Sequence, residues 1–163
     1  MIHTWTSKWK RGQKAPKFAT ELHDGNTLTS DDLLGKKYIL FFYNHDGTET
    51  CTKEACNMRD HYAKLKRKGY KVFGVSVDSQ RKHQNFISKY QLPYPLISDT
   101  DNALAKLFDI YGEKKFMGRI SDAVHRTTFV IDDKGKFEAI IHPVNSGDHA
   151  QQILDALKSN DQT

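Results

Sequence analysis

The chain has 163 residues, of which 37% are hydrophobic and 28% are charged, and its formal net charge is +5. A chain of this length folds as one compact domain that buries roughly two thirds of the surface exposed by its unfolded form, so a structural disulfide is not needed. Residues 1–12 contain no signal-peptide core and no later segment approaches membrane-spanning length, which excludes an integral membrane protein and predicts a cytoplasmic location.

The positive charge is concentrated in residues 64–71, at the predicted end of a helix and in the turn that follows it. A basic patch of this kind is compatible with nucleic-acid binding. Solvated lysines that complement the negative end of a helix give the same pattern. We therefore predict neither a nucleic-acid partner nor a membrane partner.

The first strong element is the continuously apolar or aromatic run over residues 38–43, which is typical of a strand covered on both faces. The apolar residues that follow recur every three or four positions, which predicts a helix that ends near Gly69. The members of this stripe are Cys51, Ala55, Met58, Tyr62 and Leu65. A strand followed by a helix is the start of an α/β pattern.

Residues 72–78 form a second predicted buried strand, and Ser79 is placed to cap the next helix. The inner face of that helix consists of His83, Phe86, Ile87 and Tyr90. We interpret His83 as a hydrogen-bonded histidine at the edge of the core.

Two prolines, Pro93 and Pro95, precede a short extended segment over 96–98, and a short helix over 103–108 follows. After a stretch of mixed polarity over 111–124, strand patterns over 126–131 and 136–141 are joined by a hairpin turn at 132–135. A terminal amphipathic helix contains Ala150, Ile153, Leu154 and Leu157. The order predicts a single α/β domain over residues 1–163, with a mixed central sheet and helices on both faces.

The two cysteines, Cys51 and Cys56, follow the first predicted strand. A strand that delivers Cys51 to the first turn of a helix places its sulfur among unpaired N–H groups and at the positive end of the helix dipole. Both features stabilise the thiolate, which is the reactive form of cysteine. The sequence therefore predicts sulfur redox chemistry.

Several segments together carry a resemblance to a known family. They are Thr48, Cys51, Glu54 and Cys56, then Gly74 to Ser76, Leu92 to Leu96, Gly112 to Gly118, and Arg126 to Ile131. With these segments the chain resembles a peroxiredoxin of the bacterioferritin-comigratory, or Q-type, subfamily. The resemblance implies a thioredoxin-like fold and the reduction of hydrogen peroxide and organic hydroperoxides, without a cofactor. It also implies a monomer that thioredoxin or a similar dithiol reduces.

The resemblance assigns roles to the residues of the site. Cys51 is expected to be the peroxidatic residue that passes through sulfenic acid, rather than a buried inert cysteine. Arg126 is expected to bring a permanent cation beside it. Thr48 is expected to orient the peroxide, with a helix cap or turn hydroxyl as the alternative. Glu54 is expected to support Arg126 or the backbone.

Cys56 is the expected resolving residue, which forms an intramolecular disulfide with Cys51. On one helix the two residues are separated by about 7.5 Å along the axis and roughly 140° around it, beyond the span of about 7 Å between α-carbons that a disulfide tolerates. We therefore expect the first turns of the helix to unwind after oxidation. The alternative is that Cys56 only fills space and that an outside thiol reacts with Cys51.

The chain departs from the subfamily at three positions. Asn44 stands where the subfamily usually has proline, and Glu49 and Thr50 stand where it has proline and glycine. We expect Asn44 to leave a wetter pocket and a looser loop. Glu49 would repel a thiolate at Cys51 unless its side chain points to solvent.

Three other interpretations are weaker. His45 and His61 invite a metal site, but two cysteines five apart on a helix cannot face one ion, so we expect none. Disulfide oxidoreductases on this fold place two residues between their cysteines, whereas four intervene here. A noncatalytic peroxide sensor or redox-switched binding module could use the same oxidation. Outside the site, Trp5 and Trp9 are expected to pack onto the domain.

Overall fold

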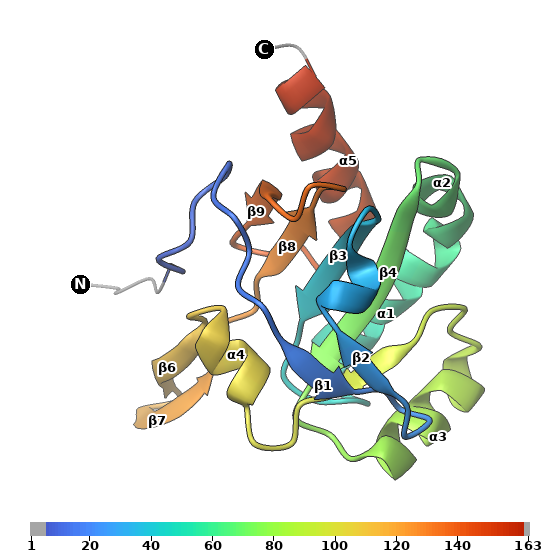
Figure 1. Cartoon of the computed structure of the whole chain (residues 1–163). Coiled ribbons are helices and arrows are strands. Elements are labelled where there is room, and N and C mark those ends of the chain that lie inside the picture. The colour runs from blue at the N-terminus through green and yellow to red at the C-terminus, as the bar shows by residue number, and fades with distance from the viewer. Residues whose placement is uncertain (1–5, 162–163) are drawn as a thin grey trace.

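The computed structural model describes residues 6–161, and its core is a five-stranded sheet in the order β5–β4–β3–β8–β9 (Figure 1). The strands are β3 (Lys37–Phe42), β4 (Tyr70–Ser76), β5 (Leu96–Ser98), β8 (Thr128–Ile131) and β9 (Phe137–Ile141). β3, β4 and β5 are parallel, whereas β8 is antiparallel to both β3 and β9. The predicted mixed sheet is confirmed.

Alternate residues of β3 point to opposite faces of the sheet, and both faces are covered. Ile39 and Phe41 pack against one set of helices, whereas Leu40 and Phe42 pack against α4 and the amino-terminal segments. The helices on the first face are α1 (Glu49–Asp60), α2 (Tyr62–Arg67), α3 (Gln80–Tyr90) and α5 (His149–Asp161). The second face carries α4 (Ala103–Leu107), β2 (Thr27–Thr29) and the 3-10 helix Asp31–Leu33 (Figure 1). Burial on both faces explains why residues 38–43 read as an unbroken apolar run.

The amino-terminal segment packs onto the domain. The Trp9 ring lies 5.7 Å from the Phe137 ring, and its Nε1 donates a hydrogen bond of 3.1 Å to the Leu107 carbonyl. This confirms the prediction for Trp9, while Trp5 lies outside the described residues. The chain then forms β1 (Ala19–Glu21), which pairs with β2 as a short hairpin.

The region of mixed polarity is a second hairpin, formed by β6 (Tyr111–Phe116) and β7 (Arg119–Val124). Its turn has positive φ at both Met117 (52°) and Gly118 (81°), which is the geometry of a tight hairpin turn whose twist matches the strands. Most of β7 is exposed, so no buried face imposes an apolar pattern on its sequence. The residues of this hairpin therefore carry no strand signal.

The predicted long helix is two helices, because the chain breaks at His61 between α1 and α2.

Close packing explains one glycine of β4. A Cβ at Gly74 would lie 2.7 Å from a Leu96 side-chain atom and 2.8 Å from the Phe41 ring, so only glycine fits. No helix in residues 6–161 has the length and apolar character needed to cross a membrane.

Candidate active site

Cys51 lies in the first turn of α1, just after β3 and the loop that leaves it. Its side chain is 2% exposed, and both cysteines are free thiols. The first N–H groups of a helix have no partner within the helix and carry the positive end of its dipole. The predicted placement of Cys51 in the first turn of a helix is therefore confirmed.

Thr48 is the residue that precedes α1, but its side chain makes no capping hydrogen bond. Its hydroxyl instead donates to the His45 carbonyl at 3.3 Å. Thr48 therefore occupies the N-cap position of α1, and its hydroxyl makes the contact of a turn residue and not that of a cap. Because a hydroxyl can donate one hydrogen bond and accept others, the oxygen of Thr48 retains acceptor capacity.

Glu54 and Arg126 form a buried ion pair across 72 residues of sequence. Glu54 lies one turn beyond Cys51 and is fully buried, and its Oε2 accepts a hydrogen bond from Nη2 of Arg126. Arg126 precedes β8, which is held beside β3 by the pairing of Phe41 with Thr128. Its Nε is buried and has no hydrogen-bond partner among the described residues. Glu54 thus supports Arg126, as expected, and the buried Nε of Arg126 is left without a partner in this part of the chain.

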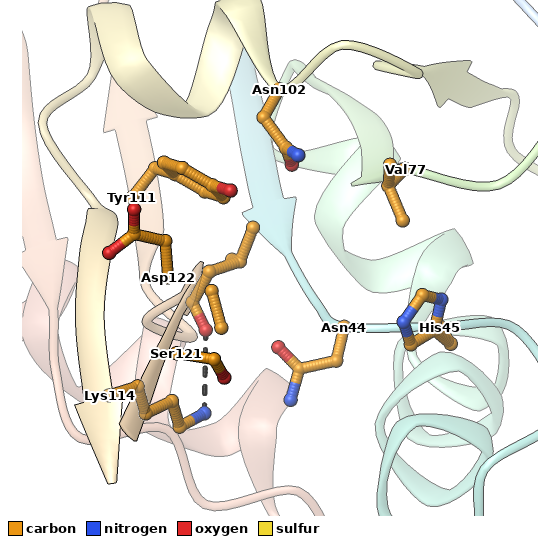
Figure 2. Close-up of a pocket in the computed structure, with 10 residues that line it drawn as sticks. Asn44, His45, Val77, Asn102, Tyr111, Lys114, Ser121 and Asp122 are labelled. Atoms are coloured by element: carbon orange, nitrogen blue, oxygen red, sulfur yellow. Dashed lines mark hydrogen bonds between the residues drawn. The ribbon is translucent and has the colours of Figure 1, made fainter. Parts of the chain in front are cut away.

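A pocket of about 500 Å³ lies beside the loop that carries Thr48, between that loop and the β6–β7 hairpin. Figure 2 shows the side chains of Asn44 and Lys114 extending into it from opposite sides, with Val77 and Tyr111 farther along its wall. The Oδ1 atom of Asn44 is buried without a hydrogen-bond partner among the described residues. An amide that is only partly satisfied adds polar character to this pocket.

Lys114 lies close enough to Arg126 and Cys51 to interact with them electrostatically. Burial lowers the pKa of Lys114, and the charge of Arg126 lowers it further, while negative charge at Cys51 acts in the opposite direction. Its Nζ donates a long hydrogen bond of 3.4 Å to the Val124 carbonyl (Figure 2). Two cations and one cysteine thus share one region, which favours negative charge there.

Cys56 is half-buried on the same unbroken helix as Cys51. Their separation of five helical residues matches the sequence-based geometry, in which no disulfide can form without unwinding.

The exposure of Glu49 bears on one departure from the subfamily. The Glu49 side chain is 86% exposed and lies 3.5 Å from Lys53, so its charge is directed into solvent.

His149 is a site residue that sequence reasoning missed. It is fully buried at the start of α5; its Nε2 lies 2.6 Å from the Thr128 hydroxyl and its Nδ1 lies 3.1 Å from Oε1 of Gln152. The amide oxygen can only accept, so Nδ1 carries the proton and Nε2 accepts from the hydroxyl. Burial lowers the pKa of His149 to about 4, so it is neutral, and Oε1 of Glu54 lies 3.8 Å from it without a hydrogen bond. A histidine in a terminal helix carries no local signal for this contact.

Glu54 and His149 are expected to act on stability in opposite directions. Burial raises the pKa of Glu54 from 4.5 to about 7 against the lowering effect of Arg126. Between these values the folded chain holds a proton that the unfolded chain releases, so stability falls as pH rises. For His149, with values of about 4 folded and 6.5 unfolded, the unfolded chain holds the proton and stability rises with pH.

We therefore predict that His149→Asn unmasks the Glu54 effect. The Glu54 contribution to the free energy of unfolding of this variant should fall by about 3 kcal/mol between pH 4.5 and pH 7. The Glu54→Gln variant should instead gain stability from pH 4 to pH 6.5. Urea denaturation across this range measures both slopes, and parallel profiles for the two variants would contradict the prediction.

Comparison with known proteins identifies the family. The sequence model of the AhpC/TSA family matches residues 11–140. A protein of Coxiella burnetii named as a peroxiredoxin bcp is 41% identical over 146 residues, which cover 90% of this chain and 97% of that protein. Peroxiredoxin Bcp of Escherichia coli is 36% identical over 151 residues, with 93% and 97% covered.

Solved structures give the same result for the fold. Peroxiredoxin Q of Xanthomonas campestris superposes with a TM-score of 0.81 at 32% identity, over 87% of this chain and 90% of that one. PrxQ of Xylella fastidiosa superposes with a TM-score of 0.87 at 26% identity, over 96% and 99%. The chain therefore belongs to the AhpC/TSA family, with a thioredoxin-like fold and the thiol peroxidase activity of the Bcp, or Q-type, peroxiredoxins.

Proposed function

We propose that Cys51 is the peroxidatic residue and that Arg126, Thr48 and the start of α1 serve it. The observation that carries this proposal is the location of a reduced, buried Cys51 one turn before Glu54, which holds Arg126 by an ion pair. The Cys51 thiolate attacks one peroxide oxygen, so that an S–O bond forms and the O–O bond breaks. Sulfur is oxidised by two electrons to sulfenic acid, and the departing oxygen takes a proton and leaves as water or an alcohol.

In this reaction negative charge moves from sulfur to the departing oxygen. Donors that lie along that path stabilise the transition state more than the ground state. Arg126 has a buried Nε without a partner among the described residues, and this donor is suited to the peroxide. The Thr48 hydroxyl accepts a hydrogen bond from the peroxide and fixes its direction of approach.

The pocket beside the loop receives the organic part of larger hydroperoxides. Its wall combines apolar side chains, including Val77 and Val124, with the amide of Asn44 and the ammonium of Lys114. A bacterioferritin comigratory protein of Xanthomonas campestris superposes with a TM-score of 0.83 at 28% identity. That protein has alkyl peroxide reduction activity. Hydrogen peroxide and alkyl hydroperoxides are therefore the proposed substrates.

Cys56 is the proposed resolving residue. Its thiol condenses with the sulfenic acid of Cys51 to form a disulfide and water, once the first turns of α1 have unwound. A dithiol protein, thioredoxin or a similar reductant, then reduces the disulfide by exchange. The protein acts as a monomer in the cytoplasm.

Replacing Cys56 with serine tests this cycle. We expect the variant to lose at least about 90% of its thioredoxin-dependent turnover, because no intramolecular disulfide forms for the dithiol to attack. The first oxidation should proceed at the wild-type rate, because Cys56 lies outside the first turn of α1. Peroxide consumption with thioredoxin, its reductase and NADPH measures turnover, and stoichiometric thiol titration measures the first oxidation.

Substitution of Thr52 by serine provides the matched control, because it alters another side chain of α1 and leaves both thiols. Unchanged turnover in Cys56→Ser would contradict the resolving role. A wild-type protein that is oxidised once and never turns over would instead favour the noncatalytic sensor.

A further inference from the structure

A buried polar network anchors the loop between β3 and α1 at Asp46. The side chain of Asp46 is 7% exposed, and its two oxygens have different partners. Oδ1 accepts a hydrogen bond of 2.5 Å from the Tyr43 hydroxyl, and Oδ2 lies 2.7 Å from Nδ1 of His83 on α3. The residue just ahead of Gly47 and Thr48 is therefore tied to the core.

His83 links this carboxylate to the central sheet. Its ring is fully buried, and its Nε2 lies 2.9 Å from the Ile97 carbonyl on β5. A carbonyl only accepts hydrogen bonds, so Nε2 carries a proton and donates to β5. His83 thus bridges β5 and the Asp46 carboxylate through its two ring nitrogens.

Asp78 holds the backbone of the same loop residue. Its Oδ2 accepts a hydrogen bond of 2.8 Å from the Asp46 N–H and one of 2.6 Å from the Ser76 hydroxyl. Potential metal-ligand atoms of Asp46, Asp78 and His83 lie within 4.8 Å of one another. The hydrogen bonds already engage the facing atoms of Asp46 and His83, so a hydrogen-bonded anchor accounts for the arrangement without an ion.

Immediately after Asp46 the loop becomes exposed and loosely packed. Gly47 has a φ of +85°, and a Cβ placed on it would meet nothing within 4 Å. Thr48 is exposed, and its hydroxyl donates a hydrogen bond of 3.3 Å to the carbonyl of His45 within the same loop. The buried hydrogen bonds of this anchor thus end at Asp46, and an open glycine separates them from the exposed Thr48 that precedes α1.

We propose that His83, acting through Asp46, is a positioning residue for the loop between β3 and α1. It fixes the amino-terminal side of this loop, so that the loop opens only from Gly47 onwards. This inference rests on the proposed roles of Cys51 and Cys56. Attack on peroxide needs Thr48 and the start of α1 in a fixed geometry, whereas disulfide formation needs the same segment to open. The anchor favours the first step and restrains the second.

The two steps can be measured separately. In a Cys56→Ser background, dimedone trapping gives the rate at which peroxide converts Cys51 to sulfenic acid. With both cysteines present, rapid quenching and mass spectrometry give the rate of disulfide formation. We expect His83→Gln, which cannot bridge partners on two opposite sides, to slow the first step roughly 10- to 100-fold and to accelerate the second about tenfold.

Two further variants test the same contact by a smaller change and provide a control. Tyr43→Phe removes only the hydroxyl bonded to Asp46 and should shift both rates in the same opposite directions by smaller factors, even if His83→Gln fails to fold. His23→Gln is the matched control, because His23 also contacts β5, by accepting from the Leu96 N–H at 3.3 Å, but lies outside the loop. It should leave both rates unchanged.

The outcomes are distinguishable. Rates that stay unchanged, or that both fall by one common factor, in folded His83→Gln and Tyr43→Phe would overturn the positioning role and leave the proposed function intact. A wild-type protein that forms neither sulfenic acid at Cys51 nor the disulfide with Cys56 would overturn the proposed function and this inference together.

Discussion

Replacing Cys51 with serine is expected to reduce peroxide consumption on the order of 10⁴-fold or more, to the background rate. A serine hydroxyl stays protonated near neutral pH, so the helix start and Arg126 have no anion to stabilise. Oxygen also cannot take the place of sulfur in a sulfenic acid. Loss of hydrogen peroxide and of cumene hydroperoxide, followed with the thioredoxin system, measures the effect.

The substitution replaces one buried sulfur atom by oxygen and should leave the fold intact. Far-UV circular dichroism and thermal unfolding check this. Cys56→Ser is the matched control, because it carries the same chemical change on the same helix and still consumes one equivalent of peroxide. Substantial turnover by a folded Cys51→Ser variant would mean that another group attacks the peroxide.

Removal of the Arg126 charge is the second large effect. Loss of one donor to a developing oxyanion typically costs 10²- to 10³-fold in rate, and we expect Arg126→Met to slow the first oxidation by roughly this factor. Methionine retains length and apolar contact but offers neither charge nor N–H groups. The second-order rate constant for peroxide, from stopped-flow competition, measures the loss.

A buried partner complicates this variant, because Arg126→Met leaves the Glu54 carboxyl unpaired, and broken buried pairs are strongly destabilising. The comparison is therefore made in a Glu54→Gln background, where no carboxylate is left behind. Arg119→Met is the remote control, because Arg119 is exposed at the start of β7. If the two arginine variants lose rate equally, Arg126 has no specific role in the chemistry.

The sequence predicts the parts of the fold that are buried on both sides. β3 and β4 were found within two residues of their observed ends, because continuous apolar runs record burial on two faces. The β6–β7 hairpin was missed because β7 is mostly exposed. β1 and β2, at three residues each, are too short to show a period.

The same distinction applies to the site. Thr48, Cys51 and Glu54 belong to one strand–loop–helix segment, whose local pattern places them at the start of α1. Arg126 and His149 reach Glu54 from 72 and 95 residues away in sequence, and no local pattern specifies such contacts.

His83 is an intermediate case. Its position on an apolar stripe predicted a hydrogen-bonded histidine near the core, and the structure confirms this with bonds at both ring nitrogens. The sequence did not reveal that one of these bonds reaches the loop between β3 and α1, because Asp46 lies 37 residues earlier.

The packing of α1 has a consequence for survival at high oxidant concentration. While the helix stays wound, the oxidised sulfur of Cys51 remains exposed to a second hydroperoxide, which would carry it to sulfinic acid, a form that dithiols cannot reduce. Cys51 and Glu54 are buried, with 2% and 0% of their surface accessible, so unwinding of the stretch from Cys51 to Glu54 must draw side chains out of the core. The opening rate of that stretch determines how many catalytic cycles each molecule completes before permanent inactivation.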